Sequence, residues 1–282
     1  EENNMENFVT LNNGVKMPRL GFGVYQIDDL AQTQQVVEDG LEIGYRLVDT
    51  AQIYGNEQAV GDAIKRSNVP REDIFVTSKI WVNDYGYDNT LKAFDDSMKK
   101  LQLDYIDLYL IHKPYNDYYG TWRALERLYK EGRIRAIGVS SFWNERLADL
   151  ITFNDVKPAV NQIETNVWNQ EWKSQKYMEK EGVQPEAWAP FAEGANHIFT
   201  NPVLEEIAAK HHKTTAQVML RWFLQRNYVV IPKSVHKKRL AENFDVFDFE
   251  LDAEDMKKIK TLDQGHSILE DEMDPEIVES FR

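Results

Sequence analysis

The sequence has no cysteine, and this absence excludes disulfide bonds, thiolate zinc sites and thiol nucleophiles. It also lacks an excess of positive charge, because 33 Lys and Arg residues face 47 Asp and Glu residues, for a formal net charge of −14. A surface of this sign repels polyanions, so we expect neither a nucleic acid nor an anionic membrane as partner. The histidines show no His-Glu-x-x-His spacing, and we expect no bound metal.

Long hydrophobic runs are absent too, so the sequence predicts no membrane-spanning segment. The first six residues are acidic and polar, the opposite of a secretory signal, and we expect a cytoplasmic protein. The sequence does contain an ordinary globular composition, with 42% hydrophobic and 28% charged residues. Its 282 residues are a common length for an α/β barrel, and we expect a single domain over residues 1–282.

Strand-like and helix-like hydrophobic patterns alternate along the chain. Eight short apolar runs, counted from Leu20, are separated by apolar residues at helical spacing, and no linker interrupts them. This alternation predicts a (β/α)8 TIM barrel, an α/β fold with parallel strands. Before it, residues 7–18 are typical of an N-terminal β-hairpin, because Asn13-Gly14 supplies the positive φ angles of a two-residue turn.

Two extra helices are expected in addition to the barrel helices. Their apolar residues lie at 203–207, before the seventh barrel helix, and at 256–259, near the end of the chain. Residues 263–282 are acidic and irregular in pattern. On a barrel, we expect this tail to fold over the active face as a loop.

Four polar residues lie at or just after the ends of predicted strands: Asp49, Tyr54, Lys79 and His112. In a parallel barrel such strand ends meet at one face, where barrel enzymes carry out their chemistry. Burial would lower the pKa of Lys79 unless an anion lies close, and Asp49 is the obvious anion. A charged Lys79 would in turn lower the pKa of Tyr54 and suit the phenol to proton donation, while His112 could orient a carbonyl oxygen.

Each of the four also has an ordinary structural interpretation, as a helix N-cap, a loop residue, a surface lysine or a core histidine. Together they suit protonation of an oxygen while a hydride reaches its carbon, and only a cofactor can supply that hydride. Lys233, Ser234 and Arg239 follow the last strand, where barrels commonly bind phosphate, although a solvated basic helix start explains them equally well. Trp188 ends the seventh strand and could stack on a flat ring or belong to the core.

Several distinctive motifs follow one another in order along the chain. They are Val48-Asp-Thr-Ala-Gln-Ile-Tyr-Gly-Asn-Glu57, Leu110-Ile-His112, Ile137-Gly-Val-Ser-Ser-Phe142, Asn161-Gln-Ile-Glu164 and Ile231-Pro-Lys-Ser234. With these motifs the chain resembles the aldo-keto reductases from roughly Val9 to Asp263. The resemblance points in particular to the bacterial branch with 2,5-diketo-D-gluconate reductases and glyoxal or methylglyoxal reductases.

The resemblance implies a monomeric enzyme that uses NADP(H) to reduce small carbonyls, α-dicarbonyls or keto sugars to alcohols. It implies a catalytic tetrad made of the four strand-end residues, with Tyr54 as general acid. It also implies a substrate pocket lined by Tyr25, Trp81 and Lys113. The residues implied to bind the cofactor are Gly23, Val24, Ser140, Ser141, Gln162, Trp188, Lys233, Ser234, Val235, Arg239, Glu242 and Asn243.

Within that set, the resemblance assigns Ser140, Ser141 and Gln162 to the carboxamide of the nicotinamide and Trp188 to its ring. It assigns Lys233, Ser234 and Arg239 to the 2′-phosphate, and Glu242 and Asn243 to the neighbourhood of the adenine. No metal is implied.

Three departures from the family pattern stand out. Ser141 replaces the usual Asn of Ser-Asn-Phe, Asn166-Val167 replaces a common His-Pro, and Lys113 replaces a Trp or Gln after the catalytic histidine. We hypothesise that Lys113, if it faces the pocket, favours substrates that carry an anion; the alternative is that it points to solvent.

Two other functions remain open at the level of sequence. A Schiff-base aldolase could use Lys79, although the paired Asp49 and Tyr54 and the phosphate cluster argue against it. A non-catalytic NADP-binding sensor or interaction protein could have the same fold, and the intact tetrad counts against that.

Overall fold

The structure is a computed structural model that describes residues 7–282, so the acidic segment at residues 1–6 lies outside the described residues. Its strands form an antiparallel two-stranded sheet and a parallel eight-stranded sheet in which neighbours follow the order of the chain. The strands are β1 Phe8–Thr10, β2 Lys16–Pro18, β3 Phe22–Gly23, β4 Leu47–Asp49, β5 Phe75–Ile80, β6 Ile106–Ile111, β7 Ile134–Ser140, β8 Val160–Glu164, β9 Gln184–Trp188 and β10 Val229–Val230.

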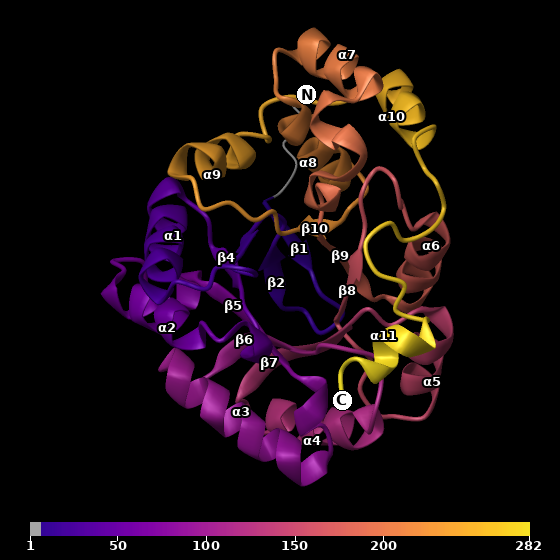
Figure 1. Cartoon of the computed structure of the whole chain (residues 1–282). Coiled ribbons are helices and arrows are strands. Elements are labelled where there is room, and N and C mark those ends of the chain that lie inside the picture. Colours follow the sequence, from indigo (N-terminus) through magenta and orange to yellow (C-terminus); the bar gives the residue numbers. More distant parts are fainter. Residues whose placement is uncertain (1–6) are drawn as a thin grey trace.

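The eight-stranded sheet closes on itself between β3 and β10. Leu20 forms a parallel bridge with Val230. The amide of Gly21 donates to the carbonyl of Val230 at 3.0 Å, and the amide of Gly23 donates to the carbonyl of Pro232 at 3.2 Å. The predicted (β/α)8 barrel is therefore confirmed, and Figure 1 shows its helices as a ring around the strands.

The helices fill the connections between strands and add the extra elements expected. They are α1 Leu30–Ile43, α2 Glu57–Arg66, α3 Tyr87–Leu101, α4 Tyr118–Lys130, α5 Asn144–Thr152, α6 Trp172–Glu181, α7 Pro202–His211, α8 Thr215–Gln225, α9 Lys237–Phe244, α10 Ala253–Lys260 and α11 Pro275–Glu279. The two extra helices that the sequence predicts are α7 and α10, and α11 in the tail is a third. Within residues 7–282, no helix is both long and apolar enough to cross a bilayer.

β1 and β2 form the expected hairpin, but its turn differs from the two-residue turn that Asn13-Gly14 predicts. The amide of Gly14 donates to the carbonyl of Leu11 at 2.9 Å, and the amide of Leu11 donates to the carbonyl of Val15 at 2.8 Å. In this turn only Gly14 has a positive φ, of 88°. A tight turn followed by one left-handed glycine therefore joins the strands, a common solution for a loop longer than two residues.

Alternate side chains of the strands point into the barrel, and their character changes along its axis. Toward the N-terminal strand ends they are apolar and pack with Val9, Leu11 and Met17 of the hairpin, which closes that end. This apolar layer contains Leu47, Phe75, Leu108, Leu110, Ala136, Val160 and Val229. Toward the C-terminal ends, the same inward positions become polar, with Asp49, Lys79, His112, Ser140, Gln162 and Glu186.

The tail at residues 263–282 folds back to the C-terminal ends of the strands, as expected. Ser267 donates from its hydroxyl to a carboxylate oxygen of Glu164 at 2.6 Å, and the hydroxyl of Tyr115 donates to the carbonyl of Glu272. The tail is not wholly irregular, because it contains α11, whose N-cap Asp274 accepts from the amide of Glu276 at 2.9 Å. Figure 1 shows the tail in yellow, leading from α10 to α11.

Candidate active site

The four strand-end residues meet in one cluster around the ammonium of Lys79. Its Nζ donates to Asp49 Oδ1 at 2.6 Å, to the carbonyl of Thr50 at 3.0 Å and to the hydroxyl of Tyr54 at 3.3 Å. The Lys79 side chain is fully buried, at 0% exposure. All three donor positions of the ammonium therefore have acceptors, as a buried charge requires.

The electrostatics of the cluster hold Lys79 charged and His112 neutral. Burial alone would lower the pKa of Lys79, but Asp49, the anion expected from the sequence, and Tyr54 outweigh it and raise that pKa above its ordinary value. Burial, followed by the charges of Lys79 and Lys113, lowers the pKa of His112 well below its ordinary value. His112 packs edge-on against Tyr54, with ring centres 5.9 Å apart, so a neutral imidazole lies beside the phenol.

The pKa of Tyr54 moves in the direction opposite to the one predicted. Burial raises it to about 12, although Lys79 acts to lower it. The prediction of a net decrease is wrong because the loss of hydration around the phenol outweighs the nearby ammonium. Tyr54 therefore keeps its proton at neutral pH, and Lys79 is positioned to stabilise the tyrosinate that proton donation would leave.

A further carboxyl group, which sequence reasoning overlooked, lies behind the cluster. The side-chain amide of Gln162 donates both to Asp49 Oδ2 at 2.9 Å and to Glu186 Oε1. Burial, with the charge of Asp49 adding to it, raises the pKa of Glu186 to about 8. Glu186 lies at an inward position of β9, and a carboxyl at such a position within a buried strand is the signal that could have revealed it.

Aromatic side chains surround the cluster on the open side. Tyr25 is 48% exposed, and its ring centre lies 5.1 Å from that of Tyr54. Trp81 packs edge-on against His112 at 5.2 Å and against Phe281 of the tail at 5.5 Å. Phe281 comes from the far end of the chain and was not among the predicted site residues. The expected pocket residues Tyr25 and Trp81 therefore do lie around the tetrad.

Polar groups at the ends of β7 and β8 form one flank. Ser140 donates from its hydroxyl to the carbonyl of Gln162 at 2.9 Å, and the amide of Ser141 donates to the same carbonyl at 2.8 Å. Ser141 has a φ of 61°, in the left-handed region that Asn tolerates better than Ser. Trp188 is only partly buried at the end of β9, so part of its ring surface is accessible.

A basic group lies on another flank, between β10 and α9. Lys233, Val235 and Arg239 are exposed, whereas Ser234 is buried and accepts a hydrogen bond from the amide of His236 at 3.1 Å. Lys233 donates to the side chain of Gln26 at 3.3 Å. These cations carry their charge in solvent and are free to approach an anionic group.

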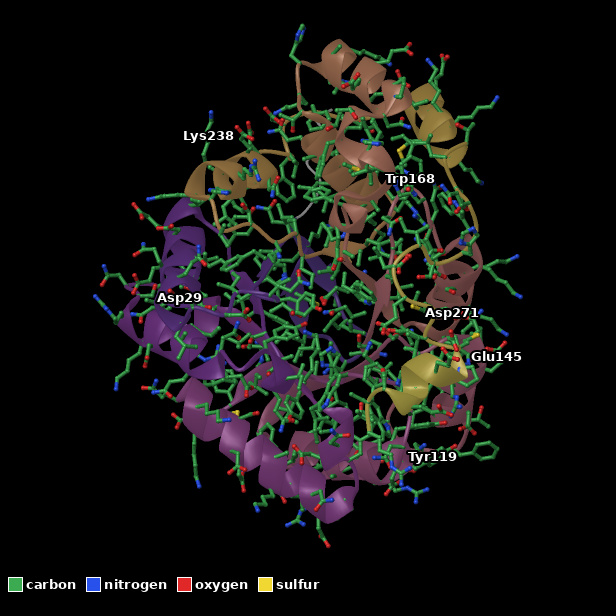
Figure 2. The ribbon with its side chains drawn as sticks, in the orientation of Figure 1. Asp29, Tyr119, Glu145, Trp168, Lys238 and Asp271 are labelled. Atoms are coloured by element: carbon green, nitrogen blue, oxygen red, sulfur yellow. The ribbon has the colours of Figure 1, made fainter. Side chains whose placement is uncertain are left out.

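The remaining predicted residues border this flank. Gly23 ends the first barrel strand and Val24 follows it, and the amide of Val24 donates to the carbonyl of Asp49 at 3.2 Å, which ties this segment to the tetrad. On α9, Asn243 is buried and Glu242 is partly buried. Figure 2 places Lys238 of α9 and Asp271 of the tail on opposite sides of the barrel.

The profile of one protein family covers residues 19–264: the aldo/keto reductase family. This match spans the barrel and every residue of the cluster around Lys79. The chain belongs to the aldo/keto reductase family. The family predicted from the sequence is confirmed, and the prediction of an NADP(H)-dependent oxidoreductase agrees with this membership.

Similar proteins include several named reductases. The chain is 48% identical over 265 residues to a glyoxal reductase of Bacillus subtilis, a match that covers 94% of this chain and 95% of that protein. It is 42% identical over 260 residues to the methylglyoxal reductase DkgA of Escherichia coli, covering 91% and 94%. A solved mutant of Gox0644 in complex with NADPH superimposes with a TM-score of 0.86 at 40% identity, covering 91% of this chain and 93% of the other.

One departure from the aldo/keto reductase pattern, Asn166-Val167, has a clear local solution. The side-chain oxygen of Asn166 accepts from the amides of Trp168 and Asn169, both at 3.0 Å. The backbone of Asn166 also pairs with that of Asn169. An asparagine can thus close this turn with its own side chain, without a proline at the next position.

Proposed function

We propose that this aldo/keto reductase transfers hydride from NADPH to aldehydes and α-dicarbonyls, with Tyr54 as the proton donor. The observation that supports this most is the single ammonium of Lys79 in contact with both Asp49 and Tyr54, beside a neutral His112. The similarity to glyoxal and methylglyoxal reductases supports small α-dicarbonyls as the preferred substrates. Action as a single 282-residue unit, as a monomer and in the cytoplasm stays a prediction.

Each member of the cluster has one role in this mechanism. The hydroxyl of Tyr54 donates its proton to the carbonyl oxygen of the substrate, and the charged Lys79 stabilises the resulting tyrosinate. Asp49 keeps Lys79 charged and in place. Neutral His112 carries one ring N–H, which is suited to hold the same carbonyl oxygen.

The residues around the cluster fit a dinucleotide with an added phosphate. NADPH supplies the hydride when it is bound. The partly exposed Trp188 offers a flat surface for the nicotinamide, and Ser140, Ser141 and Gln162 offer hydrogen-bonding groups for its carboxamide. On the other flank, exposed Lys233 and Arg239 with Ser234 would hold the 2′-phosphate, near Val235, Glu242 and Asn243.

The alternative function as a Schiff-base aldolase conflicts with the protonated state of the Lys79 amine. An amine must lose its proton before it can attack a carbonyl carbon. Asp49 and Tyr54 raise the pKa of Lys79, and its nitrogen is fully enclosed by acceptors. The geometry therefore favours a charged lysine that assists Tyr54 over a nucleophilic one.

The first test is to replace Tyr54 by Phe, which removes the acidic proton and keeps the ring. We expect kcat for methylglyoxal to fall by about 10³-fold, since general acid catalysis contributes roughly 10²–10⁴-fold. The affinity for NADPH, measured by fluorescence titration, should change little because the ring packing remains.

The control variant is Tyr87→Phe, which removes a hydroxyl from an exposed ring at the start of α3, outside the site, and should retain most of the activity. Undiminished turnover by Tyr54→Phe would refute the role of Tyr54. A parent protein that binds NADPH and reduces no aldehyde or α-dicarbonyl would instead support the sensor alternative.

A further inference from the structure

Lys113 ends in an ion pair with the tail of its own chain. Its Nζ lies 3.0 Å from Glu272 Oε1 and 4.0 Å from Glu270 Oε2. The side chains of Lys113 and Glu272 are only 11% and 15% exposed. The hypothesis of a solvent-facing Lys113 is therefore wrong, and a carboxylate of the protein already occupies this ammonium.

This ion pair belongs to the wall of the proposed substrate site. Lys113 directly follows His112, and its Nζ lies 5.2 Å from the ring centre of Phe281. Phe281 packs against Trp81, and Trp81 packs against His112. An unbroken series of contacts thus connects Lys113 with the ring that is proposed to hold the substrate carbonyl.

Two residues of the barrel, Tyr115 after β6 and Ser141 after β7, also hold Glu272 in place. The hydroxyl of Tyr115 donates to its backbone carbonyl, and Ser141 also contacts its carboxylate. Burial raises the pKa of Glu272, while Lys113 and Ser141 act to lower it. The carboxylate of Glu272 is thus largely shielded from water and has both Lys113 and Ser141 as partners.

We propose that Glu272 is a specificity-determining residue that excludes carboxylate-bearing substrates by occupying Lys113 in their place. A keto acid or acidic aldehyde that enters the site meets an ammonium already neutralised and the two carboxylates of Glu270 and Glu272. Neutral carbonyl compounds meet no such repulsion. The inference rests on the proposed reductase function and narrows its substrate class to uncharged aldehydes and α-dicarbonyls.

The structure also indicates which substitutions should let the site accept substrates that carry a carboxylate. If both tail carboxylates become amides, Lys113 loses its anions and becomes available to a substrate carboxylate. Glu270 must be changed together with Glu272, because it lies close enough to take its place. The decisive variant is therefore Glu270→Gln with Glu272→Gln, and Glu272→Gln alone should have an intermediate effect.

The assay compares aldehydes that differ only in charge. The probes are 4-carboxybenzaldehyde and succinic semialdehyde, each against its neutral methyl ester, with NADPH oxidation as the readout. For the parent, we expect kcat/KM for each ester to exceed that for the acid by at least about tenfold. In the double variant the acid-to-ester ratio should rise by about tenfold, and adding Lys113→Gln should remove that gain.

A matched control removes two negative charges at other positions of the same tail. Glu276→Gln with Glu279→Gln changes two exposed glutamates of α11 and should leave the acid-to-ester ratio unchanged. An unchanged ratio in the decisive variant, an equal rise in the control, or a gain that persists without Lys113 would each overturn the proposal. A parent that reduces none of the four aldehydes would count against the proposed function instead.

Discussion

Two lysine–carboxylate pairs lie at the ends of neighbouring strands, and they differ in how they are held. Lys79 and Asp49 both come from barrel strands, lie 2.6 Å apart and are 0% and 3% exposed. Lys113 follows a barrel strand, but its partner Glu272 comes from the tail, 159 residues later, at 3.0 Å. The first pair is fixed by the closed sheet, whereas the second depends on a segment that could be displaced.

The two pairs suit different tasks: the first supports the proposed proton donation, and the second is proposed to select among substrates. A proton donor needs a partner whose position and charge never vary, and buried groups on paired strands supply that. A group that chooses among substrates needs a partner that competes with them, and a tail residue supplies that. The same type of ion pair therefore serves two purposes, according to the element that provides the carboxylate.

The largest expected effect comes from breaking the first pair by the substitution Asp49→Asn. Lys79 would then keep a buried charge without its counter-ion, which costs about 3–5 kcal/mol. We expect the melting temperature to fall by on the order of 10 °C and reductase activity to be lost. Glu272→Gln should cost less, about 1 kcal/mol, because Glu270 lies 4.0 Å from Lys113 Nζ and can replace the lost carboxylate. Thermal melts of both variants at pH 7 would check this, and equal losses would erase the distinction between the pairs.

A smaller effect is expected at Lys233 and Arg239, whose proposed partner is the 2′-phosphate of the cofactor. Replacing Lys233 and Arg239 by Met should lower the preference for NADPH over NADH by on the order of a hundredfold, since two charge-assisted hydrogen bonds are removed. The measurement is kcat/KM with each cofactor. Lys237→Met is the control, because Lys237 pairs with Glu42 at 2.9 Å and should leave the preference intact. A parent protein that uses both cofactors equally would contradict the assignment.

The last prediction concerns Glu186, the buried carboxyl group beside the Lys79–Asp49 pair, and its effect on how stability depends on pH. Its pKa of about 8 in the folded protein exceeds its ordinary value of 4.5, so the folded state retains a proton that the unfolded state loses. Stability therefore falls as pH rises from about 4.5 to about 8, and Glu186→Gln, which cannot ionise, should escape this loss.

The expected result is a melting temperature for Glu186→Gln that gains steadily on that of the parent as the pH rises from 5 to 8. Melts across that range would show it, with Glu279→Gln at the exposed end of α11 as control. A constant difference between variant and parent at every pH would show that Glu186 does not titrate in this window.

The sequence could predict that the four strand-end residues meet, because parallel strands bring their C-terminal ends together whatever their exact register. Glu186 was missed because its inward direction depends on the register of β9. Glu272 and Phe281 were missed because they lie in a segment without hydrophobic periodicity, which is placed by contacts with Tyr115 and Trp81. The sign of the Tyr54 shift could not be predicted, since the depth of burial around a side chain is a property of the assembled barrel.

The bridge between Leu20 and Val230 has a consequence for how the protein is made. A ribosome finishes all four tetrad residues by His112, but the strand that closes the sheet emerges more than a hundred residues later. Until then β3 is an unpaired strand edge, which can pair with another chain. A nascent chain released before β10 is made would therefore contain all four proposed catalytic residues without a closed barrel, and it would be prone to aggregate through that edge.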